Sequence, residues 1–146
     1  MTMTGLPVFD ETVHATNTWL HEITSRLGWD DRQKGYRVLR LSLHALRDRM
    51  PVTEAAKFSA QLPMLLRGVF FEGWRPSATP TKVRSKDEFL AGLRSAFSED
   101  PDFDAEAAFR EVISVMKFHI TAGEIKGVRR VMPGKIRALW DEELPQ

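Results

Sequence analysis

The segment 50–70, MPVTEAAKFSAQLPMLLRGVF, decides the fold, because the chain repeats its pattern at 120–140, ITAGEIKGVRRVMPGKIRALW. The two segments match at a constant offset of 70 residues without a gap. Self-similarity at a fixed period is typical of duplicated supersecondary units. The matched positions are mostly apolar, which indicates a shared core: Phe58 and Val128, Leu62 and Met132, Leu66 and Ile136, Phe70 and Trp140, with Glu54 and Glu124, and Pro63 and Pro133.

Apolar residues at helical spacing predict four helices in each copy, so we expect an all-α fold of about eight helices. Residues 1–15 are polar and would form an irregular arm. Thr16 or Asn17 would cap the first helix, and Gly28 would end it in a left-handed conformation. The second helix would follow over about 31–50, where apolar residues recur every three or four positions.

The shorter helices are predicted from their caps and prolines. Thr53 would cap the third helix, and Pro63 would lie in the first turn of the fourth. Ser85, followed three residues later by a glutamate, would open the fifth helix with a capping box. Pro133 would turn the chain into a last helix that ends near Glu142. Helices that meet at a proline form a sharp corner, and this corner is the repeated feature.

The repeat defines the expected domain organisation. We expect a single domain over 1–146, with repeat units at about 17–74 and 86–144 joined by a proline-containing linker at 75–85. Each unit exposes an apolar face that it cannot bury alone. The two units should therefore pack together as one bundle, about a pseudo-twofold axis.

The composition excludes several classes of protein. The 146 residues are 42% hydrophobic and 28% charged, which is ordinary for a globular chain, and the net charge of +1 gives no global attraction to nucleic acid or acidic membranes. Without cysteine there is no disulfide framework, no cysteine-ligated zinc and no thiol catalysis. The first residues do not resemble a signal peptide, and no apolar run is long enough to span a bilayer. We therefore expect a cytoplasmic protein without a membrane segment.

Three segments resemble a known bacterial family. They are LRLSLHALRDRM at 39–50, TEAAKFSAQLP at 53–63 with a tryptophan soon after, and KDEFLAGL at 86–93. This pattern is similar to the family of domain of unknown function 2267, over roughly residues 17–142. The resemblance implies a small all-helical bacterial protein with no established activity, and it supplies no catalytic residue. The second copy departs from the distinctive element, since Val131 stands where the first copy has Gln61.

One stretch has the spacing of a calcium loop. Asp100, Asp102, Asp104 and Glu111 occupy positions one, three, five and twelve of such a loop. The sixth position is Ala105, where the sharp turn of the loop needs glycine, and a helical pattern begins inside the stretch. We therefore interpret Asp102 and Asp104 as N-terminal caps of that helix, and we expect no metal site.

The four histidines show no catalytic or zinc-binding spacing: His14, His21, His44 and His119. His44 lies beside core positions, so we expect a hydrogen-bonded, partly buried imidazole. Glycine-rich phosphate loops are missing as well, so no catalytic residue and no cofactor is expected. Basic residues gather in the last third of the chain, where a helix-turn-helix reader of nucleic acid is the alternative to solvated charge: Lys117, Lys126, Arg129, Arg130, Lys135 and Arg137.

Four aromatic residues lack an apolar counterpart in the other copy or lie just beyond the repeated corner: Trp29, Phe71, Trp74 and Phe118. Such residues either fill an asymmetric seam between the copies or form an exposed contact patch. We take them as candidate interaction anchors. The leading hypothesis is a noncatalytic helical module that acts through protein contacts or self-association. A bundle that binds a small ligand or lipid between its units is the first alternative. An enzyme and a nucleic-acid binder follow.

Overall fold

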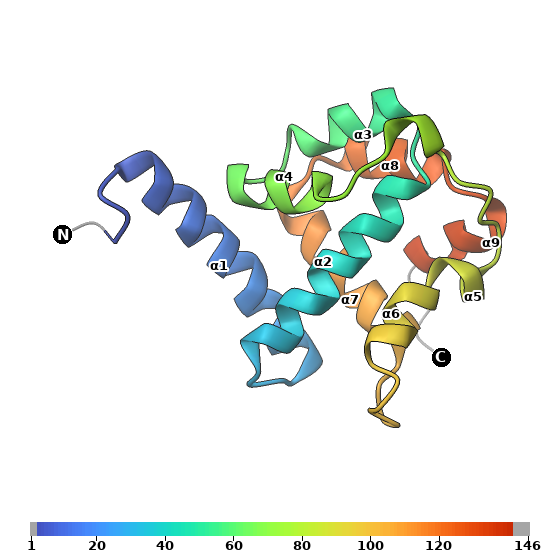
Figure 1. The fold of residues 1–146 in the computed structure, drawn as a ribbon, viewed down its shortest axis with the longest axis horizontal. Helices are drawn as coiled ribbons and strands as arrows, with labels where there is room; N and C mark the ends of the chain where they lie inside the picture. The colour runs from blue at the N-terminus through green and yellow to red at the C-terminus, as the bar shows by residue number, and fades with distance from the viewer. Residues whose placement is uncertain (1–2, 142–146) are drawn as a thin grey trace.

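The computed structural model describes residues 3–141, and within them the chain is all-α, as the sequence predicts (Figure 1). This part of the chain contains no strand. The helices are α1 (Pro7–Leu27), α2 (Arg32–Asp48), α3 (Val52–Ser59), α4 (Met64–Phe71), α5 (Lys86–Phe89), α6 (Ala91–Ala96), α7 (Ala105–His119), α8 (Ala122–Arg130) and α9 (Gly134–Arg137). Two short 3-10 helices complete it, η1 (Pro76–Ala78) and η2 (Ala138–Trp140).

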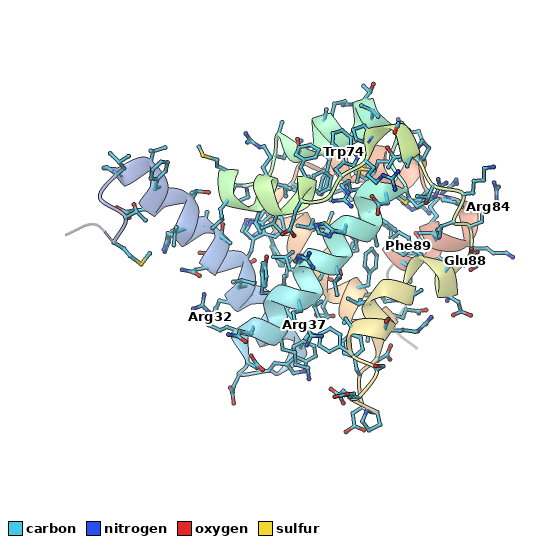
Figure 2. All side chains as sticks on the ribbon, viewed as in Figure 1. Arg32, Arg37, Trp74, Arg84, Glu88 and Phe89 are labelled. Carbon is cyan, nitrogen blue, oxygen red and sulfur yellow. The ribbon has the colours of Figure 1, made fainter. Side chains whose placement is uncertain are left out.

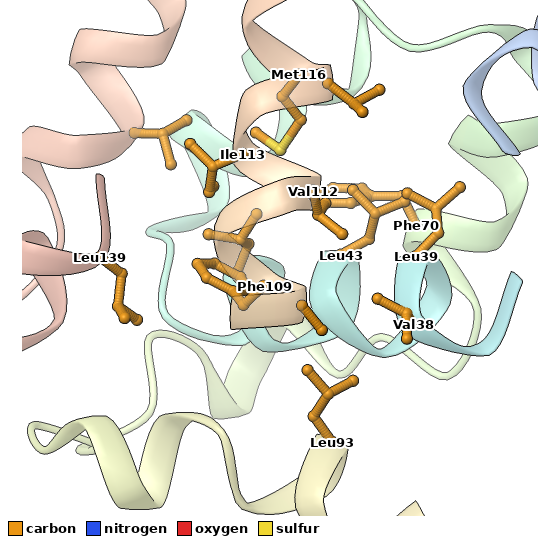
Figure 3. Close-up of a cluster of buried hydrophobic side chains, with 14 of the residues drawn as sticks. Val38, Leu39, Leu43, Phe70, Leu93, Phe109, Val112, Ile113, Met116 and Leu139 are labelled. Atoms are coloured by element: carbon orange, nitrogen blue, oxygen red, sulfur yellow. The ribbon is translucent and has the colours of Figure 1, made fainter. Parts of the chain in front are cut away.

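The core lies around α2 and α7, which contact each other and α1. Leu39 and Leu43 of α2 face Phe109 and Val112 of α7, and Phe70 of α4 joins them (Figure 3). All five side chains are fully buried. The buried apolar residues of both halves form one continuous cluster.

Helix α1 begins at Pro7, ten or eleven residues before the start that a cap at Thr16 or Asn17 predicts, so the expectation of an irregular arm over 1–15 is wrong. Pro7 occupies the first turn, where its fixed φ suits the helix and its missing N–H is not needed. The backbone N–H and the hydroxyl of Thr4 both donate to Asp10 Oδ1, at 2.9 and 2.7 Å. These two hydrogen bonds hold the start of α1, where Leu6 at the N-cap makes no side-chain hydrogen bond. Gly28 ends the helix with φ 72°, as predicted.

The helix expected to start at Ser85 is divided into α5 and α6. Ser85 does cap it, since its Oγ accepts the Glu88 backbone N–H at 3.1 Å. The break occurs at Leu90, whose ψ of 2° departs from the helical value. Phe89 and Leu90, which lie at the break, are both buried.

The two proline corners have nearly the same geometry. Pro63 has φ −54° and ψ 148°, and Pro133 has φ −57° and ψ 152°. These extended ψ values place each proline one residue before its helix, at the N-cap, and not in the first turn as predicted for Pro63. Arg67 Nη2 donates to the Leu62 carbonyl at 3.3 Å, and Arg137 Nη2 donates to the Met132 carbonyl at 3.0 Å. The offset of 70 relates these two hydrogen bonds.

Two further boundaries differ from the predicted ones. Helix α3 begins at Val52 with Pro51 at its N-cap, so Thr53 lies inside the first turn and does not cap it. The last predicted helix is short α9 followed by η2, which ends at Trp140. Its expected end near Glu142 lies outside the described residues.

Candidate functional site

The structure places the four aromatic candidates at separate positions. Trp29 follows α1 and is half-buried against the α6–α7 connection, with its ring centroid 6.4 Å from that of Phe97 and 6.2 Å from that of Phe103. Phe71 and Trp74 pack on each other at 4.8 Å, and both lie half-buried against the core. Phe118, on the last turn of α7, is 73% exposed. Among the four, Phe118 alone presents an open ring, so they do not form one patch.

Exposed apolar side chains gather instead at the start of α1 and the start of α4. We call this the α1–α4 surface; its members are Met3, Leu6, Val8, Phe9, Met64 and Leu65, each 45–76% exposed. The Leu65 backbone N–H donates to Thr12 Oγ1 at 2.9 Å, which joins the two helix starts. Figure 1 shows the first turns of α1 projecting from the body of the molecule. Exposed apolar side chains on two helices that contact each other mark an interaction site more often than scattered apolar residues do.

The α1–α4 surface continues a seam that is buried elsewhere. Along α1, residues alternate at spacings of three and four, the pattern of helix pairing: Leu6, Phe9, Val13, Thr16, Leu20, Ile23 and Leu27. Thr16, Leu20 and Ile23 are buried against the body. Phe9 and Leu6, about two and three turns before Thr16, are 45% and 50% exposed. The seam therefore extends past the body without an internal partner for its first turns.

Sequence reasoning missed this surface because it treated residues 1–15 as irregular. The signal was present, since Leu6, Phe9 and Val13 repeat the spacing that identifies the later part of α1. The surface is also weakly acidic. Asp10 and Glu11 lie within it, and no lysine or arginine precedes Arg26 in the sequence.

The acidic stretch 100–111 is occupied by internal bonds. Asp104 caps α7 by accepting the Ala107 backbone N–H at 3.0 Å. Asp100 accepts a hydrogen bond from Lys34 at 3.1 Å, which lowers the pKa of Asp100, and Glu111 pairs with Arg26 at 2.7 Å. Within residues 3–141, no group of three or more metal-ligating side chains lies together. Of the two aspartates expected to cap the helix, Asp104 does so.

Two histidines take part in packing. His44 Nε2 lies 2.7 Å from the Val69 carbonyl, and burial lowers the pKa of His44. This confirms the hydrogen-bonded, partly buried imidazole. His119 Nε2 lies 2.8 Å from Glu22 Oε2, and its ring stacks on Trp19 with centroids 4.8 Å apart. His14 and His21 are exposed on α1. The engaged histidines therefore hold helices together.

Part of the basic cluster is also used internally. Arg129 Nη2 pairs with Asp141 at 2.9 Å, and Arg137 binds the Met132 carbonyl. These two guanidiniums stabilise the second corner, which leaves fewer cations for a nucleic acid.

Two glutamates related by the offset of 70 meet where α3 and α8 pack together. Glu54 is 12% exposed at its side chain, and Glu124 is 8% exposed. Each has a buried Oε1 atom without a hydrogen-bond partner. Burial raises the pKa of Glu124, and the hydrogen bond and negative charge of Glu54 raise it further. Glu124 therefore holds a proton more firmly than an exposed carboxyl does.

Gln61 ties the first corner to the start of α8. Its Oε1 accepts the Thr121 backbone N–H at 2.9 Å, and its Nε2 donates to Thr121 Oγ1 at 3.3 Å. The residue 70 positions before Thr121 is Pro51, which has no N–H to satisfy. The apolar Val131, which takes the place of Gln61 in the second copy, therefore leaves no equivalent donor unpaired.

A comparison with family models shows which family the chain belongs to. The model described as an uncharacterized conserved protein, DUF2267, matches residues 16–139. The chain belongs to this family. A search of curated proteins gives no match. The DUF2267 segment includes both proline corners and the Glu54–Glu124 contact, and it begins at Thr16, so the projecting turns of α1 precede it. Among residues 3–141, no helix combines the length and apolar character needed to cross a membrane.

Proposed function

We propose that this DUF2267 protein is a noncatalytic helical module that acts through protein contacts, and that its partner is a second copy of the chain. The observation that carries the proposal is the seam of α1, which is buried over Thr16–Leu20 and continues exposed through Phe9 and Leu6.

The projecting turns of α1 need a packing partner for physical reasons. A short helical segment is marginal in water on its own, because helix stability comes mainly from burying an apolar face. Exposed Phe9 and Leu6 gain about 25 cal/mol for each Å² of apolar area that a partner covers. Met64 and Leu65 of α4 form a second apolar wall beside them. The surface therefore suits one additional helix lying along α1.

A second copy supplies such a helix. In twofold-symmetric dimers the same patch serves on both subunits, so an uncovered apolar strip is matched by its own image. Among the described residues, large exposed apolar side chains gather only at the α1–α4 surface, while Tyr36, Val52 and Phe118 lie apart from it. Two α1 helices packed against each other would cover Leu6 and Phe9 of both copies.

The original candidates take different places in the structure. Phe118 is exposed but lies at the end of α7, apart from the α1–α4 surface, so it has no part in this contact. Trp29, Phe71 and Trp74 serve the interior of the molecule, where each packs against the core.

Sedimentation of matched variants tests the proposal. We expect the parent protein to sediment as a dimer and Phe9→Glu to sediment as a monomer, because a charge in the apolar contact is left without a partner. Val52→Glu is the control, since Val52 is 44% exposed against 45% for Phe9 but lies at the start of α3. Both variants should keep the helical circular dichroism of the parent. A parent that stays monomeric at high concentration, or a Phe9→Glu variant as dimeric as Val52→Glu, would overturn the proposal.

A further inference from the structure

A cavity of about 240 Å³ lies between α2 and the segment that runs from the linker through α5 to α6. Figure 2 shows Phe89 on the α5 side facing α2, with Glu88 and Arg84 further out toward the linker. The cavity is separate from the α1–α4 surface, because no residue of α1 or α4 lines it. One backbone and one side-chain hydrogen bond hold its wall in place: the Thr81 N–H donates to the Asp48 carbonyl at 2.8 Å, and Arg49 Nη1 donates to the Thr81 carbonyl.

The inner part of the cavity is aromatic and apolar. Phe89 and Phe109 meet edge to face with ring centroids 5.1 Å apart, and Leu90 and Leu93 complete the lining. All four are at most 5% exposed. Such walls favour a flat apolar ligand, since a further ring can pack against both phenylalanines.

Two buried polar atoms on this wall have no partner. The Ser42 hydroxyl belongs to a residue that is 1% exposed, and it forms no hydrogen bond. The Arg49 Nε–H is buried and also unpaired. Buried polar groups are normally hydrogen-bonded, so two unpaired groups lining one cavity indicate a ligand that satisfies them. Arg49, at the C-cap of α2, lies seven residues after Ser42, about 10 Å along the helix axis.

The charge around Arg49 favours an anion. Burial and the positive charge of Arg84 both lower the pKa of Arg49. The acidic residues that line the mouth are engaged elsewhere, since Asp48 pairs with Arg47 at 2.9 Å and Glu88 bonds Ser85 at 3.0 Å. Within residues 3–141, neither Arg49 nor Arg84 forms an ion pair. A carboxylate at Arg49 would supply the missing negative charge.

We propose that this cavity binds a small aromatic carboxylate that carries a hydroxyl group at the opposite end. The carboxylate accepts a hydrogen bond from Arg49 Nε, the ring packs against Phe89 and Phe109 from the cavity side, and the ligand hydroxyl bonds Ser42 Oγ. The volume fits such a ligand. At the roughly 30 Å³ that a water molecule occupies in the liquid, the cavity has room for about eight non-hydrogen atoms, and for a few more in a compact bonded ligand.

Titration with two probes tests the proposal, with 4-hydroxyphenylacetate as the expected ligand and phenylacetate as its counterpart without the hydroxyl. Binding is measured by ligand-observed NMR and by the shift in melting temperature. We expect 4-hydroxyphenylacetate to bind and to raise the melting temperature of the parent protein. Arg49→Gln should weaken both probes at least tenfold, because a charge-assisted hydrogen bond is lost. Arg75→Gln, an exposed arginine away from the cavity, is the matched control and should change neither affinity.

Ser42→Ala separates the two ends of the ligand. It should weaken 4-hydroxyphenylacetate about fivefold and leave phenylacetate unchanged, because the hydroxyl of the ligand alone meets Ser42. If neither probe binds the folded parent, or if Arg49→Gln binds both as well as Arg75→Gln does, the proposed site is wrong. Equal losses for the two probes in Ser42→Ala would overturn the orientation in the cavity. Dimerisation through the α1–α4 surface is measured separately and does not depend on this result.

Discussion

At the scale of single residues, Glu54 and Glu124 occupy equivalent positions of the repeat and lie in contact with each other. The two carboxyls lie on helices α3 and α8, which pack together although they are 70 positions apart in sequence. Lys57, 3.7 Å from Glu54, offsets part of the negative charge. Burial and Glu54 raise the pKa of Glu124 above its ordinary value of 4.5. The folded state therefore favours the protonated acid.

This shift predicts a pH dependence of stability. Because the folded-state pKa of Glu124 is raised, its stabilising effect is complete below about pH 4.5 and is lost as the pH rises through the folded-state value. Glu124→Gln removes the ionisation, so it should become progressively more stable relative to the parent as the pH rises above about 4.5. Urea unfolding at several pH values measures the difference.

Glu99→Gln is the control for this prediction, because Glu99 is exposed. Its stability difference from the parent should not vary with pH over the same range. A Glu124→Gln difference that is equally flat would contradict the raised pKa.

At the scale of helices, Gly35 sets the close approach of α1 and α2. A Cβ atom at position 35 would lie 2.5 Å from Thr24 Cγ2. Thr24 cannot easily move, because it is 6% exposed and its hydroxyl donates to the Leu20 carbonyl at 3.1 Å. The contact between the two helices therefore depends on the absence of a side chain at this one position.

Gly35→Ala should destabilise the protein by about 1–3 kcal/mol, since overpacking outweighs the better helix propensity of alanine. The double variant Gly35→Ala with Thr24→Ser should recover most of the loss, because serine keeps the hydroxyl and removes the clashing methyl group. Denaturant midpoints of the single and double variants measure both effects. A single variant that is as stable as the parent would show that the helices separate without strain.

At the scale of the whole molecule, the two halves share one core. Contacts between α1 and α7, between α2 and α7, and between α3 and α8 all cross the linker. A fragment of about 60 residues buries only about 60% of its unfolded surface, which is marginal for independent folding. The chain should therefore fold as one cooperative unit.

Separated fragments test this prediction. Fragments 1–84 and 85–146 should each show little helix by circular dichroism, and mixing them should restore helicity and a cooperative thermal transition. The first fragment keeps the linker because the linker bonds the end of α2 through Thr81. Cooperative melting of either fragment alone would contradict the shared core and favour two independent domains.

The sequence by itself determined the all-α class, the stop at Gly28, the buried face of each long helix and the short helices that meet at Pro63 and Pro133. These features depend on local chemistry: helical spacing of apolar residues, φ > 0 at glycine and the fixed φ of proline. The spacing of Leu6, Phe9 and Val13 is an equally local signal. It was sufficient to predict the early start of α1.

Only the tertiary structure decided which aromatic residues are buried, since Trp29 meets Phe97 and Phe103 across a long sequence separation. It also decided the break at Leu90, where the helix that Ser85 caps is divided into α5 and α6. The cavity and the exposed seam belong to this level too. Exposure and cavities depend on how the helices pack. Packing brings together residues that are distant in the chain, and their spacing in the sequence does not predict the contact.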